Sequence, residues 1–420
     1  MASDRLYDLA VRYRKAKLWK DLTDDALFGV RLANGEIGYC SVMGMMGEHF
    51  ALGVYRGREG LDSYRLLAQI TEELPDSEIF FRMLSQDCLQ CSFETKGELS
   101  PEELEEAKSY GKRKRVSFRG QMAFPRFQKY RPYYAPAVVK DTGDEELLCL
   151  ALEAAIAIAE RAKKESPEAL GFTYGAPFDR EIPLLEPAGD GFRWSMLPLP
   201  ERREIVPESP ALSNEILLGK IKRMKKRGER ICELFMFPVP TELEDGSGLC
   251  SFPVVLIALD PKSGMVLPDV MDLGCHGGEA LLASFATALV KAKSVPSSIY
   301  VRNERAYLFL ENFCKQAGIQ LYKEDSERTD ILDEIEEDLM SGLDGFPGDG
   351  LDVFDDADEF DDMDGIDEIG MLSAVAEMIG KCSDKEIREM PEGMKEAVRA
   401  MLGQGLFSPS KEKKLKKLLR

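Results

Sequence analysis

Histidine is almost missing from this 420-residue chain, which contains two of them. A structural zinc site needs four cysteine or histidine ligands close together, so such a site is hard to assemble here. The nine cysteines are odd in number and scattered, mostly within apolar runs. That distribution is typical of buried, reduced thiols in a cytoplasm rather than of a disulfide framework.

Long apolar runs are missing as well. The longest, residues 147–159, is interrupted by Glu153 and is shorter than the roughly 20 residues that a membrane-spanning helix needs. The opening segment Met1–Arg5 is followed by no apolar stretch, so we expect no signal peptide. We therefore predict a soluble, cytoplasmic protein that does not bind membranes.

The net charge of −20 is concentrated in one segment. Residues 324–368 contain 21 of the 75 acidic residues and one of the 55 basic residues, which leaves equal numbers of acids and bases elsewhere. A nearly neutral body thus carries one strongly negative stretch. This distribution argues against a generally basic nucleic-acid-binding protein and against a globally acidic surface.

The length and the 44% apolar content predict two or three globular domains with sizeable cores. Helical and strand patterns alternate, which favours sheets flanked by helices, an α+β or α/β chain. We expect two mixed-sheet domains, residues 1–165 and 213–341, joined by proline-rich strands over 166–212. A disordered acidic linker over 342–366 and a helical region with a basic tail over 367–420 should follow.

Local signals predict several elements within the first domain. Asn34 and Gly35 supply the positive-φ positions of a tight hairpin. Ser100, followed by Pro101 and by a glutamate at the third helical position, predicts a capped helix. Residues 144–164 form the clearest amphipathic helix. The stretch 120–136, rich in proline and aromatic residues, is expected to be irregular.

One group of blocks is distinctive. The blocks are Gly35–Cys40, Met43–Gly44, Gly47–Leu52, Val54–Gly57 and Glu59–Leu61. Together they resemble the opening of an uncharacterised bacterial family made of two tandem domains of unknown function. The resemblance implies a domain layout over roughly residues 1–340 and supplies no catalytic residues, because the family has no assigned activity.

Three further blocks are similar to the same family: residues 86–89 with 91–94, residues 118–120 with 130–132, and residues 296–318. Two arginines in these blocks, Arg119 and Arg131, are candidate binding residues. The chain departs from the family pattern over Tyr133–Val138, where glycine and tryptophan are expected. The surface formed by that stretch should therefore differ from the family's.

Glu48 and His49, beside a glycine-rich loop, form the first candidate site. An imidazole next to a carboxylate can act as a general base. On a strand, however, adjacent side chains point to opposite faces, which weakens the pairing. The alternative is a loop histidine satisfied by backbone groups.

Cysteine-containing motifs give two weaker candidates. Cys88 and Cys91 have the spacing of a zinc knuckle or a redox pair, but they stand alone in a strand-like stretch. Cys275 and His276 precede a helix, whose first amide groups can bind an anion. Core thiols and a simple helix-entry loop are the structural alternatives.

Asp260 lies in a turn between two predicted strands, followed by helix, strand, helix and strand. That order resembles the ribonuclease H-like core of nucleases, which need several carboxylates to hold two metal ions. Asn303 stands where a second acid is expected, after the strand at 299–301. An amide at that position argues against an active nuclease.

Basic runs at 112–115 and 220–230 can contact phosphates, but they are also typical of solvated helix faces or of partners for an acidic segment. The aspartate-rich stretch lacks the acids that an EF-hand calcium loop needs, where Phe360 and Met371 stand. We therefore expect no bound metal and no cofactor.

The sequence favours a binding or interaction protein over an enzyme. The alternative function is a metal-dependent or degenerate phosphodiesterase with a ribonuclease H-like second domain, and a pure interaction scaffold is a third possibility. The acidic linker is expected to be a charged tether that contacts the basic tail or a protein partner and screens basic surfaces from nucleic acid.

Overall fold

The structure is a computed structural model. It describes residues 2–47, 49–71, 73–120, 122–174, 180–189, 191–203, 207, 209–237, 240–243, 246–267, 270–272, 278–324, 332, 333 and 335. All of them belong to one compact unit, residues 1–349. The acidic linker predicted over 342–366 and the helical region predicted over 367–420 lie outside the described residues.

The first sheet is mixed. Its strands are β1 (Phe28–Arg31), β2 (Ile37–Met43), β3 (Phe50–Arg56), β4 (Cys88–Glu94), β5 (Phe124–Arg131), β6 (Tyr134–Val138), β7 (Glu181–Ala188), β8 (Gly191–Pro198), β10 (Thr241–Glu242) and β11 (Cys250–Ser251). They lie in the order β10-β11-β6-β5-β4-β3-β2-β1-β7-β8. Neighbouring strands are antiparallel, except that β1 and β7 are parallel. The sheet thus takes strands from the connecting segment and from the second half of the chain.

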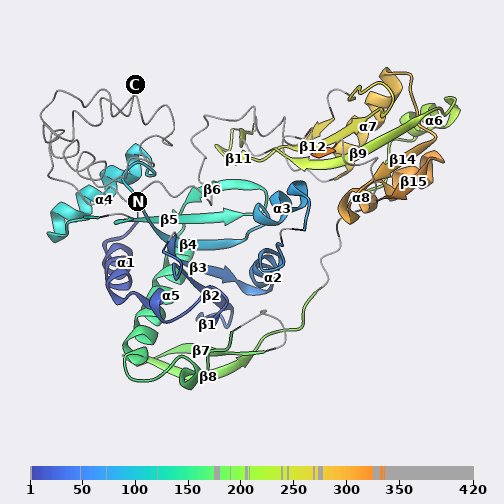
Figure 1. The fold of residues 1–420 in the computed structure, drawn as a ribbon. Helices are drawn as coiled ribbons and strands as arrows, with labels where there is room; N and C mark the ends of the chain where they lie inside the picture. The colour runs from blue at the N-terminus through green and yellow to red at the C-terminus, as the bar shows by residue number, and fades with distance from the viewer. Residues whose placement is uncertain are drawn as a thin grey trace, which may run out of the picture. The chain divides into compact units, whose positions relative to one another are not determined.

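Helices cover both faces of this sheet. The bounds are α1 (Asp4–Ala16), η1 (Leu18–Lys20), α2 (Gly57–Leu67), α3 (Asp76–Met83), α4 (Pro101–Lys114), α5 (Thr142–Ala162) and η2 (Glu168–Leu170). Helices α1 and α5 pack side by side on one face (Figure 1) and bury the main apolar core together with α4. Helix α2 covers a smaller aromatic core on the other face, around Tyr39 and Tyr55.

Most local predictions for this region are confirmed. The hairpin forms, but of its two predicted positive-φ positions Gly35 has one, at 88°, and Asn34 does not. The Ser100 hydroxyl accepts a hydrogen bond from the backbone N–H of Glu103, and the Glu103 carboxylate accepts one from the backbone N–H of Ser100, which completes a capping box. The long amphipathic helix is α5.

The expectation of an irregular segment over 120–136 is wrong. Strands β5 and β6 occupy most of it, and β5 pairs with β4 from Phe124 to Tyr130. Pro125 lies beyond the last β5–β6 pair, at Gln128, so its missing N–H breaks no ladder there. Pro136 lies on β6 opposite the register shift between Lys129 and Arg131, a place where proline is tolerated.

The second sheet is also mixed. Its strands are β9 (Glu229–Met236), β12 (Val254–Leu259), β13 (Met271–Asp272), β14 (Ser298–Val301) and β15 (Gln320–Lys323), in the order β13-β12-β9-β14-β15. Its helices are α6 (Glu215–Arg223), α7 (Gly278–Lys291) and α8 (Glu304–Ala317). The two strands that flank α8, β14 and β15, are parallel to β9, whereas β12 is antiparallel to it. The chain therefore has the predicted class, two mixed sheets flanked by helices.

Helix α3 connects the two sheets. Phe80 packs with Phe235 of β9 at a ring-centroid distance of 6.0 Å, and Phe81 joins the core under α7 and α8. Leu332, fully buried, packs into the same apolar cluster as Phe80. Contacts with the second sheet thus come from the first domain and from the start of the acidic stretch. No helix in the described part of the chain is long and apolar enough to cross a membrane.

Candidate binding site

A cavity of about 1130 Å³ lies between the end of α2, helix α3, residues 202, 203 and 207, and the start of α8. We call it the arginine cavity, because six arginines contribute to its wall: Arg65, Arg82, Arg202, Arg203, Arg302 and Arg305. Six acidic residues also line it, so its selectivity depends on how these charges are paired.

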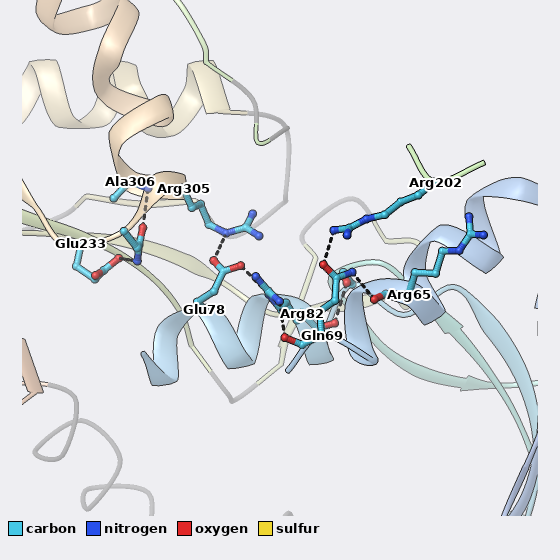
Figure 2. A network of polar contacts seen from close by, with 10 residues as sticks. Arg65, Gln69, Glu78, Arg82, Arg202, Glu233, Arg305 and Ala306 are labelled. Carbon is cyan, nitrogen blue, oxygen red and sulfur yellow. Dashed lines mark hydrogen bonds and ion pairs between the residues drawn. The ribbon is translucent and has the colours of Figure 1, made fainter. Parts of the chain in front are cut away.

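Gln69 organises one wall of the arginine cavity (Figure 2). Its side-chain oxygen accepts a hydrogen bond from Arg202, and its amide donates to the backbone oxygen of Arg65 at 2.5 Å. Its backbone oxygen accepts from Nη1 of Arg82 at 2.8 Å. One residue at the end of α2 thereby links the connecting segment, α2 and α3.

Glu78 continues this network across the cavity. One carboxylate oxygen accepts from Nε of Arg82 at 2.9 Å, and the other accepts from Nε of Arg305 at 2.9 Å. Burial raises the pKa of Glu78, but the hydrogen bonds and charges of Arg305 and Arg82 outweigh it, so the pKa lies below its usual range. Glu78 is therefore a carboxylate that joins α3 to α8.

Arg305 uses only some of its hydrogen-bond donors in contacts with described residues. Its guanidinium lies over the Phe81 ring, 4.3 Å from the ring centroid, and donates through Nε to Glu78. In the part of the chain that the structure describes, its two terminal NH₂ groups have no hydrogen-bond partner. A guanidinium has five N–H donors, so Arg305 can still bind a carboxylate or phosphate.

A second buried carboxylate, Glu233, lies in the middle of β9 with a fully buried side chain. Nε of Arg302 donates to it at 2.7 Å, and the side-chain amide of Asn303 donates at 2.7 Å. The oxygen of Asn303 also caps α8 by accepting from the backbone of Ala306 at 2.9 Å. The charge of Glu233 is thus balanced by Arg302, and its carboxylate is held against the start of α8.

Sequence reasoning singled out Asn303 but missed Glu233. The structure brings the two together, and Asn303 lines the arginine cavity. The signal for Glu233 was present, because a lone carboxylate within an apolar strand must find a partner when it is buried. The cavity arginines gave no such signal, because they come from segments far apart in the sequence.

Asp260, predicted as the first acid of a possible nuclease site, forms an ion pair with Arg230. Its carboxylate lies 2.9 Å from Nη1 of Arg230 and accepts a turn hydrogen bond from the backbone of Lys262 at 2.9 Å. The backbone hydrogen bond is the largest cause that lowers the pKa of Asp260; burial opposes it, and Arg230 adds to it. These contacts fit a residue that holds the turn after β12.

The other predicted site residues do not converge. His49 is exposed, and its Nε2 accepts a hydrogen bond from the amide of Gln90 at 2.6 Å, while Glu48 lies outside the described residues. Arg119 is exposed and donates to Ser117 at 3.0 Å, and Arg131 is exposed at the end of β5. Of the five predicted residues that the structure describes, Asn303 alone lines the arginine cavity.

The cysteine pair on β4 is separated by the sheet itself. Cys88 belongs to the core under α2, whereas Cys91 belongs to the core under α5. Burial raises the pKa of both thiols. Cys275 and His276 lie outside the described residues, among which no group of three or more potential metal ligands comes together.

The first basic run is partnered. Arg113 and Lys114, at the end of α4, form ion pairs with Asp4 and Asp8 of α1 at 2.6 Å and 2.9 Å. The second run is divided between the end of α6 and the start of β9. These contacts match the structural alternative, in which the first run is part of a solvated helix face.

The distinctive blocks between Gly35 and Leu61 have a structural basis. Glu36 pairs with Arg56 at 2.9 Å, and Arg56 lies 3.7 Å from the buried Asp144, which also binds Lys129 at 2.6 Å. A Cβ at Gly60 would lie 2.7 Å from a backbone carbon of Tyr55 in β3, so only glycine lets α2 approach the sheet this closely.

Comparison with known families agrees with this layout. Residues 4–176 match a domain of unknown function (DUF7309), and residues 217–340 match another domain of unknown function (DUF6930). The chain is a tandem of two domains of unknown function. A search of the curated proteins found no match to it. These matches confirm the tandem layout predicted from the sequence. Neither family description names an activity, so the matches assign no catalytic residue.

Proposed function

We propose that this tandem protein binds an anionic small molecule in the arginine cavity and performs no chemistry on it. One observation carries the proposal: Arg305, held by Glu78 and Phe81, lines the cavity with two NH₂ groups to which no described residue is hydrogen-bonded. A guanidinium held in this way loses little freedom when it binds a carboxylate or phosphate.

The setting of the cavity supports this function. Ligand sites are concave, commonly lie where domains meet, and have volumes of several hundred to about 1000 Å³. Four of the six acidic residues in the wall are paired with arginine or lysine: Asp62, Glu78, Glu304 and Asp333. These carboxylates therefore repel an incoming anion less than their number suggests.

The domain division and the location are part of the proposal. The two family matches support domains close to 1–165 and 213–341, and β7 and β8 support a structured connection between them. A cytoplasmic location is supported by the seven described cysteines, all of which are free thiols.

Isothermal titration with sodium tripolyphosphate and with citrate tests the proposal. We expect saturable binding of at least one probe that weakens as salt is raised. Arg305→Met and Arg82→Met should each weaken it by about tenfold. Arg193→Met, on an exposed arginine of β8 that pairs with Glu186, should leave it unchanged. Absence of saturable binding, or equal loss in the Arg193 variant, would contradict the proposal.

The alternative phosphodiesterase function has a separate test. Asp260 pairs with Arg230, and the buried acid nearest to Asn303 is Glu233, which is held by Arg302. We expect no turnover of bis(p-nitrophenyl) phosphate with Mg²⁺ or Mn²⁺. Turnover that Glu233→Gln abolishes would favour the enzyme instead.

A further inference from the structure

Tyr133, in the wall of the arginine cavity, has a backbone conformation that suits glycine. Its φ is 68°, in the left-handed region that side chains with a Cβ rarely adopt. Two hydrogen bonds hold it there: its N–H donates to the oxygen of Leu84 at 2.7 Å, and its oxygen accepts from the N–H of Phe252 at 2.9 Å. Tyr133 is the second of the two residues between β5 and β6, a turn position that often has a positive φ, and its ring packs against the core of the second domain.

The side chain of Tyr133 contacts Phe81, the same ring on which Arg305 lies. Its ring packs edge-on against Phe81, with centroids 6.4 Å apart and an interplanar angle of 80°. The guanidinium of Arg305 lies on the same Phe81 ring. Tyr133 is half-buried and lines the cavity, so a ring surface and a cationic group border the same space.

We propose that Tyr133 selects a ligand in which an aromatic ring is joined to an anionic group, a nucleotide being the chemical class. An aromatic side chain offers a face on which a base stacks, and Arg305 offers donors for a phosphate. The inference rests on the proposed anion-binding function and adds the ring to it.

The test compares ATP with sodium tripolyphosphate, which has the charge without the ring. Wild-type protein should bind ATP about tenfold more tightly than tripolyphosphate in isothermal titration. Tyr133→Gly and Tyr133→Asn, two residues that accept the left-handed conformation, should remove most of that preference. Both variants should still bind tripolyphosphate within about twofold of wild type, and Tyr133→Phe should keep the preference.

The outcomes separate the inference from the function on which it rests. If wild-type protein binds both probes equally, the ring-selecting role of Tyr133 is wrong, while anion binding stands. If the glycine and asparagine variants lose both probes equally, Tyr133 acts on the fold rather than on the ring, and the inference is again overturned. If neither probe binds to wild-type protein, the proposed function itself fails. Circular dichroism of each variant establishes that it is folded.

Discussion

Glu78 is the residue through which α3 and α8 are joined. It accepts from Arg82 within its own helix and from Arg305 in the second domain. Because both partners are cationic and the site is mostly buried, the ionised carboxylate is more stable in the folded chain than in the unfolded one. That difference connects the protonation of Glu78 to the stability of the protein.

Replacement of Glu78 should therefore have a pH-dependent effect. The pKa of Glu78 is lowered from its ordinary value of 4.5, so the carboxylate stabilises the fold above about pH 4.5, and this contribution is lost as the pH falls through the lower, folded-state pKa. Glu78→Gln should cost about 2 kcal/mol near pH 7, and the difference from wild type should shrink at acid pH. Urea unfolding at several pH values measures this.

The matched control is Glu160→Gln. Glu160 pairs with Lys163 on the exposed face of α5, where ion pairs contribute little, so we expect a change of less than about 0.5 kcal/mol. A Glu78→Gln difference that is constant with pH would show that the residue acts by packing alone.

At the scale of single residues, the sequence indicated which side chains need a polar partner better than it indicated who the partner is. Asn303 was identified as standing in place of an acid, and it does lie beside one, but that acid is Glu233 rather than Asp260. The reason is that Glu233 and Asn303 are separated by 70 positions, and their contact depends on β9 lying next to β14. A single sequence does not reveal that pairing.

At the scale of elements, helices were easier to predict than strands. Helices α4 and α5 have caps and amphipathic patterns that act locally, and both begin within two residues of the predicted start. Strands β5 and β6 were missed because proline usually excludes a strand. It is tolerated here because Pro125 lies beyond the last residue of β5 that pairs with β6, and Pro136 lies opposite a shift in register.

Alternation along β4 makes a prediction about its two cysteines. Residues three apart on a strand point to opposite faces, and Cys88 and Cys91 are buried in different cores. Because burial also raises the pKa of both thiols, we expect neither to react with iodoacetamide in the native protein. Peptide mass spectrometry after brief labelling checks this.

Cys250 provides the comparison within the same chain, because it is only half-buried and should label first among the described cysteines. All of them should label after unfolding in urea. Rapid native labelling of Cys88 and Cys91, or zinc bound with the pair as ligands, would contradict the separation of the two thiols by the sheet.

At the scale of the whole described unit, the two sheets are joined at few places. Strand β11 pairs with β6 at Ser251 and Tyr134, and α3 presents Phe80 and Phe81 to the second sheet. The tandem layout was recognisable from the sequence, but this exchange of elements was not. Strands β6 and β11 lie inside different family matches, and α3 is a helix that no sequence signal predicted.

Phe81 should therefore control whether the two domains unfold together. It is 5% exposed, packs into the core of the second domain and carries Arg305 on its ring, so Phe81→Ala should cost about 3–5 kcal/mol and remove much of the coupling. We expect one calorimetric transition for wild-type protein and a broadened or split one for Phe81→Ala. Phe93→Ala, a truncation at a 1% exposed site inside the first core, should lower the transition temperature without broadening the transition. An equally sharp transition in both variants would mean that the domains are coupled elsewhere, with the pairing of β11 and β6 as the contact that remains.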